Sequence, residues 1–189
     1  MEILRLLNLE VVKILSAALP ALDPDWWNAL VLDKLTYQQK TFAMSLLPNT
    51  LESLDLAALL RVADQNWYDI AKEGGFKREA RNWLKEAQTI RNRWAHVPAE
   101  GLPDDMYYRD MDTIERLMQA FGANSQTLEG IKQEKKQLLN RLADTQKISV
   151  KIQPELISTV GGCKPGDMVR LKADPAKMGA ITAALCGET

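Results

Sequence analysis

Histidine is nearly absent from this chain of 189 residues, which contains His96 and no other. Cysteine is almost as scarce, with only Cys163 and Cys186. A structural zinc site needs about four such ligands, and a disulfide framework needs regularly spaced cysteine pairs, so the sequence supports neither. We therefore expect no metal, no cofactor and a reducing, cytoplasmic location.

Long apolar runs are also lacking. The most apolar stretch, residues 1–19, carries polar side chains at helical spacing, namely Glu2, Arg5, Asn8, Lys13 and Ser16. This pattern is typical of an amphipathic helix and not of a signal peptide or a membrane span. A glycine-rich phosphate loop of the Walker kind is missing as well, so this chain alone is not expected to hydrolyse ATP.

The overall charge has no strong sign, because the formal net charge is −1. It therefore predicts neither a nucleic-acid binder nor an acidic tail. Residues 72–93 are an exception, with seven lysines and arginines against three acidic residues. A local basic strip of this kind is a weak indication of phosphate binding.

Residues 1–122 have the pattern of a helical bundle. Apolar side chains recur every three or four positions in segments 2–19, 53–72, 77–96 and 103–122, with shorter helical pieces at 24–35 and 36–47. Gly74 and Gly75 predict a tight turn between two antiparallel helices. We predict a mainly α protein whose first domain, residues 1–122, is an up-and-down four-helix bundle.

The remainder of the chain changes character after Gly122. Residues 123–146 form a charged segment with a thin apolar stripe, which indicates a connector helix, or a helix that pairs with a copy of itself, and not a core helix. Residues 147–189 contain three short β-like runs, at 148–152, 167–172 and 180–185. Three strands are few for an independent core, so we predict a small, incomplete β-barrel segment.

The candidate site lies near the end of the third long helix, in Arg91, Asn92, Arg93 and His96. An imidazole exchanges protons near neutral pH, and arginine binds phosphoryl oxygens with two parallel donors. This chemistry suits metal-free RNA cleavage, with His96 as proton carrier, Arg91 as phosphate clamp and Asn92 as orienting group. A histidine at a helix C-terminus is also a common stabilising feature without any catalytic role.

The same segments resemble a HEPN domain, the higher eukaryote and prokaryote nucleotide-binding family. The residues that carry the resemblance are the runs 54–61, 66–68, 79–82 and 91–96, in which an arginine, a polar residue and a histidine follow the family's spacing. The resemblance covers residues 1–122 and is closest to the variety found at the front of large prokaryotic defence proteins. It implies an all-α bundle, homodimerisation and, in many members, metal-independent endoribonuclease activity.

Further residues are assigned by position. Arg93, Asp64 and Asn66 are candidate substrate-binding groups, although solvated polar side chains would look the same. Residues 162–171 and 177–181 resemble the start of a KOW-type small barrel, in which Lys164, Arg170, Lys172 and Lys177 are candidate nucleic-acid contacts; a solvated strand face would also explain them.

Two functions follow from these patterns. The first is an RNA-cleaving HEPN domain of a prokaryotic anti-phage or toxin-type defence protein. It acts as a homodimer, does not interact with a membrane, and can have an antitoxin partner. The second is a non-catalytic HEPN module that dimerises or docks nucleic acid, RNA or DNA, for an attached Swi/Snf-type helicase. In both, one copy of the histidine motif is half a site, because one imidazole cannot easily serve as acid and base together.

Overall fold

The protein is described from a computed structural model that places residues 2–45, 50–97 and 101–159, with side chains as far as Asp144. The described residues are mainly helical, as predicted, and contain no strand. The chain divides into two compact units, Met1–Asp144 and Thr145–Thr189. The helices are α1 (Glu2–Leu22), η1 (Trp27–Val31), η2 (Leu32–Lys34), α2 (Tyr37–Ser45), η3 (Leu51–Ser53), α3 (Leu56–Gln65), α4 (Trp67–Gly74), α5 (Ala80–Ala95), α6 (Asp104–Ala120) and α7 (Ser125–Thr159).

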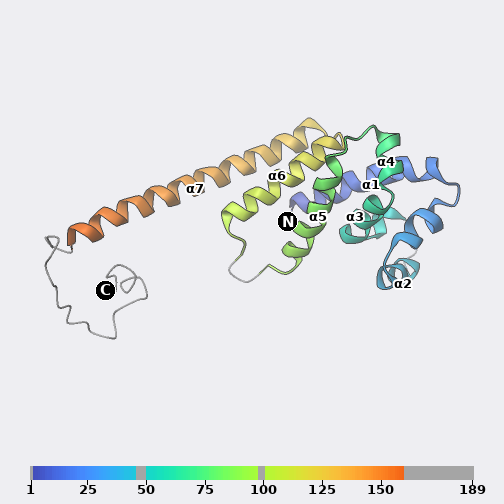
Figure 1. Ribbon diagram of the computed structural model, residues 1–189, viewed down its shortest axis with the longest axis horizontal. Helices are drawn as coiled ribbons and strands as arrows, with labels where there is room; N and C mark the ends of the chain where they lie inside the picture. The colour runs from blue at the N-terminus through green and yellow to red at the C-terminus, as the bar shows by residue number, and fades with distance from the viewer. Residues whose placement is uncertain (1, 46–49, 98–100, 160–189) are drawn as a thin grey trace, which may run out of the picture. The chain divides into compact units, whose positions relative to one another are not determined.

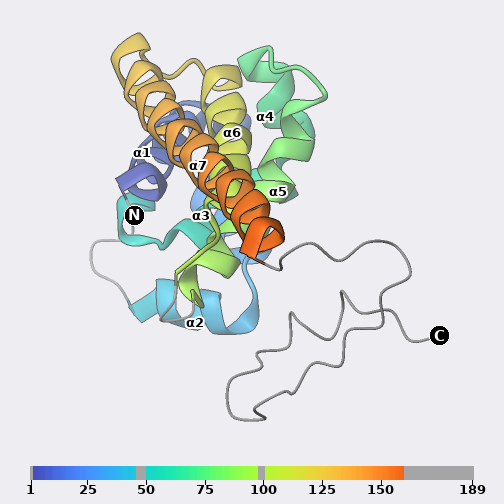
Figure 2. The ribbon, with the colours of Figure 1, turned by 90° about the vertical axis from the view of Figure 1, so that its left-hand side faces the viewer.

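The first unit is a bundle in which α5 is the central element. It packs against α3 on one side and α6 on the other, while α1 crosses α3, α4 and α6. Figure 1 shows α6 returning alongside α5, and Figure 2 shows α1, α3, α5 and α6 grouped around one interior. The candidate residues on α5 therefore belong to a helix that is packed between two others, α3 and α6.

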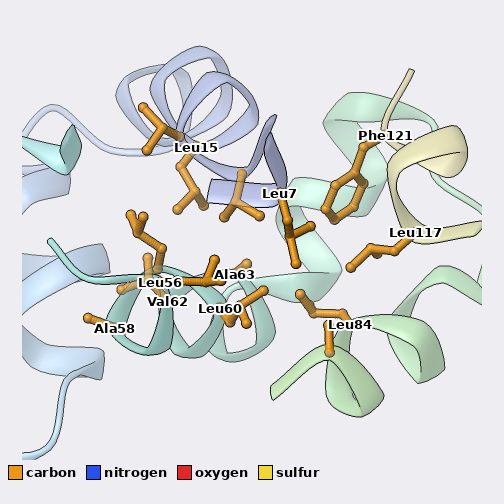
Figure 3. Close-up of a cluster of buried hydrophobic side chains, with 14 of the residues drawn as sticks. Leu7, Leu15, Leu56, Ala58, Leu60, Val62, Ala63, Leu84, Leu117 and Phe121 are labelled. Carbon is orange, nitrogen blue, oxygen red and sulfur yellow. The ribbon is translucent and has the colours of Figure 1, made fainter. Parts of the chain in front are cut away.

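The core is built from the apolar stripes of these four helices. Figure 3 shows side chains of α1 and α3 facing one another, with those of α5 and α6 closing the other end, among them Leu7, Leu60, Leu84 and Leu117. All four of these leucines have no exposed surface. Burying a leucine side chain stabilises the fold by about 1.5–3 kcal/mol, so this interior fixes the position of α5.

The predicted helix over residues 53–72 is interrupted at Asn66. The Asn66 amide nitrogen donates to the carbonyl oxygens of Leu30 and Val62, each at 2.8 Å. Its backbone leaves the helical range, with φ −102° and ψ 16°. A side chain that bonds the carbonyl four residues earlier competes with the helix ladder and bends the chain. The structure therefore has two helices, α3 and α4, in place of one.

One predicted helix end was also displaced. The first helix was expected to stop before Pro20, but α1 includes Pro20 and ends at Leu22. Proline in a last turn removes one backbone bond, and the Asp23 amide still donates to the Leu19 carbonyl at 3.3 Å. The turn between α4 and α5 forms as predicted, with Gly75 at φ +64°, a conformation that favours glycine.

The charged segment after Gly122 packs against the bundle, in contrast to the prediction of a helix outside the core. Ile131 and Leu138 are 3% and 0% exposed. Between them, Lys135 is 12% exposed and donates to Asp112 and to Glu115 of α6, the latter at 2.8 Å. One partly buried lysine between two carboxylates adds to the thin apolar stripe, and the two together dock this helix on the bundle.

The strand predicted at residues 148–152 is wrong, because α7 continues through these positions to Thr159. Extending an existing helix gains one backbone bond per residue, whereas a strand requires a paired neighbour before it gains any. The other two predicted strands, at 167–172 and 180–185, lie outside the described residues. Among the helices that the structure does describe, none has both the length and the apolar character needed to cross a bilayer.

Candidate functional site

His96 lies at the point where α5 ends. The last helical residue is Ala95, and His96 has φ −124° and ψ 31°, with its backbone N–H donating to the Arg93 carbonyl at 3.1 Å. Pro98 explains the position of this end, since a proline disfavours helical geometry in the residue before it. The sequence prediction that His96 sits in the last turn is therefore accurate to one residue.

The His96 side chain is exposed. Within residues 2–45, 50–97 and 101–144, no side chain forms a hydrogen bond or an ion pair with its imidazole. Both ring nitrogens are therefore accessible to a ligand, as proton exchange with a substrate requires.

Arg91 is held from two sides. Its Nη2 donates to Asp55 Oδ2 at 2.7 Å, and its Nη1 donates to Asn92 Oδ1 at 3.4 Å. The Arg91 side chain is 29% exposed and lines a pocket of about 340 Å³ together with Trp94 and residues of α1 and α3. The guanidinium group is thus oriented by protein contacts and still open to solvent.

Asn92 points into a different pocket, of about 220 Å³, on the side of α3. This pocket is polar, and its lining includes Arg61, Asp64 and Gln88. Arg91 and Asn92 therefore face separate hollows of one chain, linked by their own hydrogen bond. The structure does not bring Arg91, Asn92 and His96 into one cleft of a single protomer.

Arg93 and Trp94 share one buried partner on α6. Asp110 Oδ1 pairs with Arg93 Nη2 at 3.1 Å, and Asp110 Oδ2 accepts from Trp94 Nε1 at 2.7 Å. The Asp110 side chain is 4% exposed, and Arg93 Nε is buried without a hydrogen-bond partner in the described part of the chain. Arg93, a predicted substrate-binding residue, therefore anchors the end of α5 to α6.

The two predicted groups on the preceding helix have different surroundings. Asp64 Oδ1 accepts from Arg81 Nε at 3.0 Å, and the Arg81 guanidinium lies 4.9 Å from the centre of the Tyr68 ring. Asp64 still borders the pocket that contains Asn92. Asn66 is 4% exposed, and its side-chain amide donates hydrogen bonds to two backbone carbonyls. In this structure it therefore shapes the fold and does not face a substrate.

Two residues of the site were not identified from the sequence. Asp55 caps α3 by accepting from the Ala58 N–H at 2.9 Å, and its second oxygen holds Arg91. The sequence contains a signal for the capping role of Asp55, because an aspartate directly before an apolar helix is a strong N-cap candidate. Asp110 had no such signal, since an acidic residue on a helix is ordinarily exposed.

The predicted basic contacts Lys164, Arg170, Lys172 and Lys177 lie outside the described residues, as do Cys163 and Cys186. Within the part of the chain that the structure describes, no group of three or more histidine, cysteine, aspartate or glutamate side chains is arranged to hold a metal ion.

Comparison with protein families gives one match, to the Swt1-like HEPN family, over residues 2–122. This span contains α1 to α6 and all of the α5 residues described above. The chain belongs to the Swt1-like HEPN family. No curated protein and no solved structure matches it.

Family membership confirms the predicted HEPN domain and its helical architecture. It places the chain among RNase-type or nucleic-acid-related HEPN modules, a family whose domains bind RNA and often dimerise. The matched region ends two residues after α6, so α7 lies beyond the HEPN domain although its first turns pack on it.

Proposed function

We propose that this HEPN domain is a metal-independent endoribonuclease in which His96 carries the proton and Arg91 binds the scissile phosphate. One observation supports this above all others. The only histidine of the chain is exposed at the end of α5, and no described residue engages its imidazole. Proton exchange with a substrate requires an imidazole that is accessible in this way.

The reaction is an internal transfer at phosphorus. The ribose 2′-oxygen attacks the adjacent phosphorus and gives its proton to a base. The bond to the 5′-oxygen then breaks, and that oxygen takes a proton from an acid, which leaves a 2′,3′-cyclic phosphate. The Arg91 guanidinium neutralises the charge that develops on the phosphoryl oxygens, and its bond to Asn92 holds it in orientation.

A single imidazole has to be supplemented, because base and acid are needed on opposite sides of the phosphorus. A homodimer that brings two copies of the α5 end together supplies two imidazoles and two guanidinium groups. The placement of Arg91 and Asn92 in separate hollows of one chain supports this arrangement, since one protomer alone does not gather the three groups.

The biological setting we propose is a prokaryotic defence protein of anti-phage or toxin type, with RNA as substrate and an antitoxin or helicase as partner. The support for it is the family together with the resemblance of the later residues to a small KOW-type barrel. Lys164, Arg170, Lys172 and Lys177 are proposed contacts of that barrel with a nucleic-acid backbone.

A second function, a non-catalytic dimerisation or docking module of a Swi/Snf-type helicase, is favoured by one contact. Arg91 already has a carboxylate partner within the chain, at 2.7 Å from Asp55. In a docking module this ion pair would be purely structural, whereas in a nuclease it has to exchange for a phosphate.

The deciding experiment incubates single-stranded RNA with the wild-type chain, with His96→Ala and with Thr89→Ala, in EDTA. Thr89 is an exposed residue of the same helix and provides a matched control. We expect wild type and Thr89→Ala to leave 2′,3′-cyclic phosphate ends, and His96→Ala to lose at least about a hundredfold in rate, as removal of a general acid–base group does.

The rate should also change between about pH 6 and pH 8, the range in which imidazoles exchange protons. Circular dichroism melting of all three proteins tests whether they are equally folded. Equal cleavage by wild type and His96→Ala, or none by either when both are folded dimers, rejects the nuclease and leaves the docking module.

A further inference from the structure

A third pocket lies at the end of α5 and is separate from the hollow that contains Arg91. It measures about 400 Å³ and is lined by Trp94, Val97, Leu102, Asp104, Tyr107 and Arg141. Trp94 also lines the Arg91 pocket, so the two hollows share one indole as a wall. Val97, which lines this pocket, follows His96 directly in the chain, so the pocket lies at the end of α5.

The aromatic part of the pocket is fixed in place. The rings of Trp94 and Tyr107 lie 5.0 Å apart between centroids, at an interplanar angle of 35°. The indole N–H is bound to Asp110 at 2.7 Å, and the Tyr107 hydroxyl is bound to Glu134 at 2.9 Å. Since both polar atoms already have partners, the rings offer the pocket only apolar and π surface, which suits a flat aromatic ligand.

The polar part of the pocket is a carboxylate beside a guanidinium. Arg141 Nε lies 3.3 Å from Asp104 Oδ2, and Arg141 Nη2 lies 3.5 Å from Asp104 Oδ1. The two side chains are 61% and 39% exposed, respectively. A long, exposed ion pair is weak, so a ligand that satisfies both charges can take the place of their mutual contact.

We propose that this pocket is the base-specificity subsite of the domain and that it binds guanine. The Watson–Crick edge of guanine carries two adjacent N–H donors, at N1 and N2, and a carbonyl acceptor at O6. Asp104 can accept from both donors in bidentate fashion, and Arg141 can donate to the carbonyl. The base ring stacks on Tyr107, which is partly exposed and whose ring lies against the buried indole of Trp94.

The other three bases fit this combination less well. Uracil sets its single N–H donor between two carbonyl acceptors, and these would face the Asp104 carboxylate. Cytosine and adenine each place an amino donor beside a ring nitrogen that accepts, so only one carboxylate oxygen finds a donor. A base whose acceptor atom faces the Asp104 carboxylate binds less tightly, because two acceptors repel each other. This repulsion is the basis of the discrimination.

The assignment of the pocket to base recognition at the scissile position rests on the proposed ribonuclease function, but guanine binding itself does not require catalysis. The test therefore starts with binding. Guanosine, adenosine, cytidine and uridine 3′-monophosphates are titrated into the full chain, with calorimetry for affinity and the indole N–H resonance of Trp94 for location. The variants are Asp104→Asn, the matched control Asp105→Asn on the neighbouring exposed carboxylate, and His96→Ala.

We expect the guanosine nucleotide to bind at least about tenfold more tightly than the other three, as a well-formed bidentate contact produces. Asp104→Asn should remove this preference, while Asp105→Asn and His96→Ala keep it, and the Trp94 signal should move only where binding occurs. Equal affinity for the four nucleotides, absence of binding at millimolar concentration, or a preference that survives Asp104→Asn overturns the proposal.

Mapping of cut sites separates this proposal from the ribonuclease itself. If the wild type cuts RNA at every base alike and does not bind the guanosine nucleotide selectively, the subsite is rejected and the nuclease stands. If the nucleotide binds selectively but RNA remains intact, the nuclease is rejected and the guanine pocket stands. If both proposals are correct, the ratio of cuts next to guanosine to cuts next to the other bases falls toward one in Asp104→Asn.

Discussion

Arg91 on α5 and Asp55 at the start of α3 are joined by a 2.7 Å ion pair, although 36 positions separate them in the chain. The same carboxylate caps α3 through its other oxygen. One aspartate thus links the beginning of a core helix to the arginine that we propose as the phosphate clamp. The two roles can be separated by substitution, because asparagine is as good an N-cap as aspartate but carries no charge.

Asp55→Asn should therefore raise RNA affinity and keep the cap of α3. The ion pair is exposed, and such a pair contributes about 0.2–1 kcal/mol, so releasing Arg91 should tighten RNA binding by up to roughly fivefold and lower the free energy of unfolding by no more than about 1 kcal/mol. Fluorescence anisotropy measures this with a His96→Ala background, which prevents cleavage. Glu52→Gln, a neutralised exposed neighbour, is the control; identical affinities for the two variants would show that Asp55 does not compete for Arg91.

Asp110→Ala should strongly destabilise the bundle. It would leave the Arg93 guanidinium and the Trp94 indole N–H without their shared acceptor. Removing one member of a buried ion pair typically lowers the free energy of unfolding by about 3–5 kcal/mol. Urea unfolding monitored by tryptophan fluorescence tests this, with the exposed Asp105→Ala as control; a difference below about 1 kcal/mol between the two variants would contradict the anchoring role.

Lys135→Ala should release the start of α7 from the bundle. Burial alone would lower the pKa of Lys135, but its hydrogen bonds to Asp112 and Glu115 outweigh this and raise it. Burial likewise disfavours the charged form of Asp112, yet the hydrogen bonds from Lys135 and Arg116 hold the pKa of that carboxyl below its ordinary value. Removing the lysine takes away the cation that Asp112 and Glu115 share and leaves Asp112 paired with Arg116 alone.

Hydrogen exchange measures the effect. We expect faster exchange of amides in residues 128–142 of Lys135→Ala and no change in Lys136→Ala, an exposed neighbour. The pH dependence follows from the same groups. A folded-state pKa of Asp112 below the unfolded value contributes stability above the ordinary carboxyl range, and this stability is lost as the pH falls, so the wild-type amides should also lose protection in acid. Equal exchange in both lysine variants would exclude the clamp.

Tyr107 should be the last tyrosine to ionise. Burial, assisted by the hydrogen bond to Glu134, raises the pKa of Tyr107 from 10.0 to about 12. Because the folded-state pKa is the higher one, the neutral phenol stabilises the fold below about pH 10, and this contribution disappears as the pH rises toward 12. Absorbance titration at the tyrosinate band should show a late component that Tyr107→Phe lacks; its persistence in that variant would assign it to another tyrosine.

The sequence predicted the helical stripes because they repeat locally, and the core residues Leu60, Leu84 and Leu117 follow directly from that repeat. It also located the end of α5, expected at residue 96, to within one residue. It missed the break at Asn66, because that break depends on the Leu30 carbonyl, 36 positions away in the chain. Contacts between distant segments are not encoded in local periodicity.

The same reason explains which parts of the candidate site the sequence did not predict. Arg91, Asn92 and His96 were proposed as site residues from their chemistry and spacing. Asp55, which pairs with Arg91, and Asp110, which pairs with Arg93 and Trp94, come from other parts of the chain and were not foreseen. The docking of α7 was missed because a single lysine between two carboxylates of α6 adds to a stripe that looks too thin on its own. The strand expected at 148–152 was drawn from alternation alone, which a continuing helix overrode.

The exposed imidazole at the end of α5 has a practical consequence for spectroscopy. Because the chain has one histidine, every imidazole ring-proton signal in a proton NMR spectrum belongs to His96, and no assignment is needed. A symmetric dimer would give a single set of these signals, whereas an asymmetric complex, with one RNA strand across two protomers, would give two. The residue at the centre of the proposed chemistry is thus also an intrinsic reporter of the symmetry of the assembly.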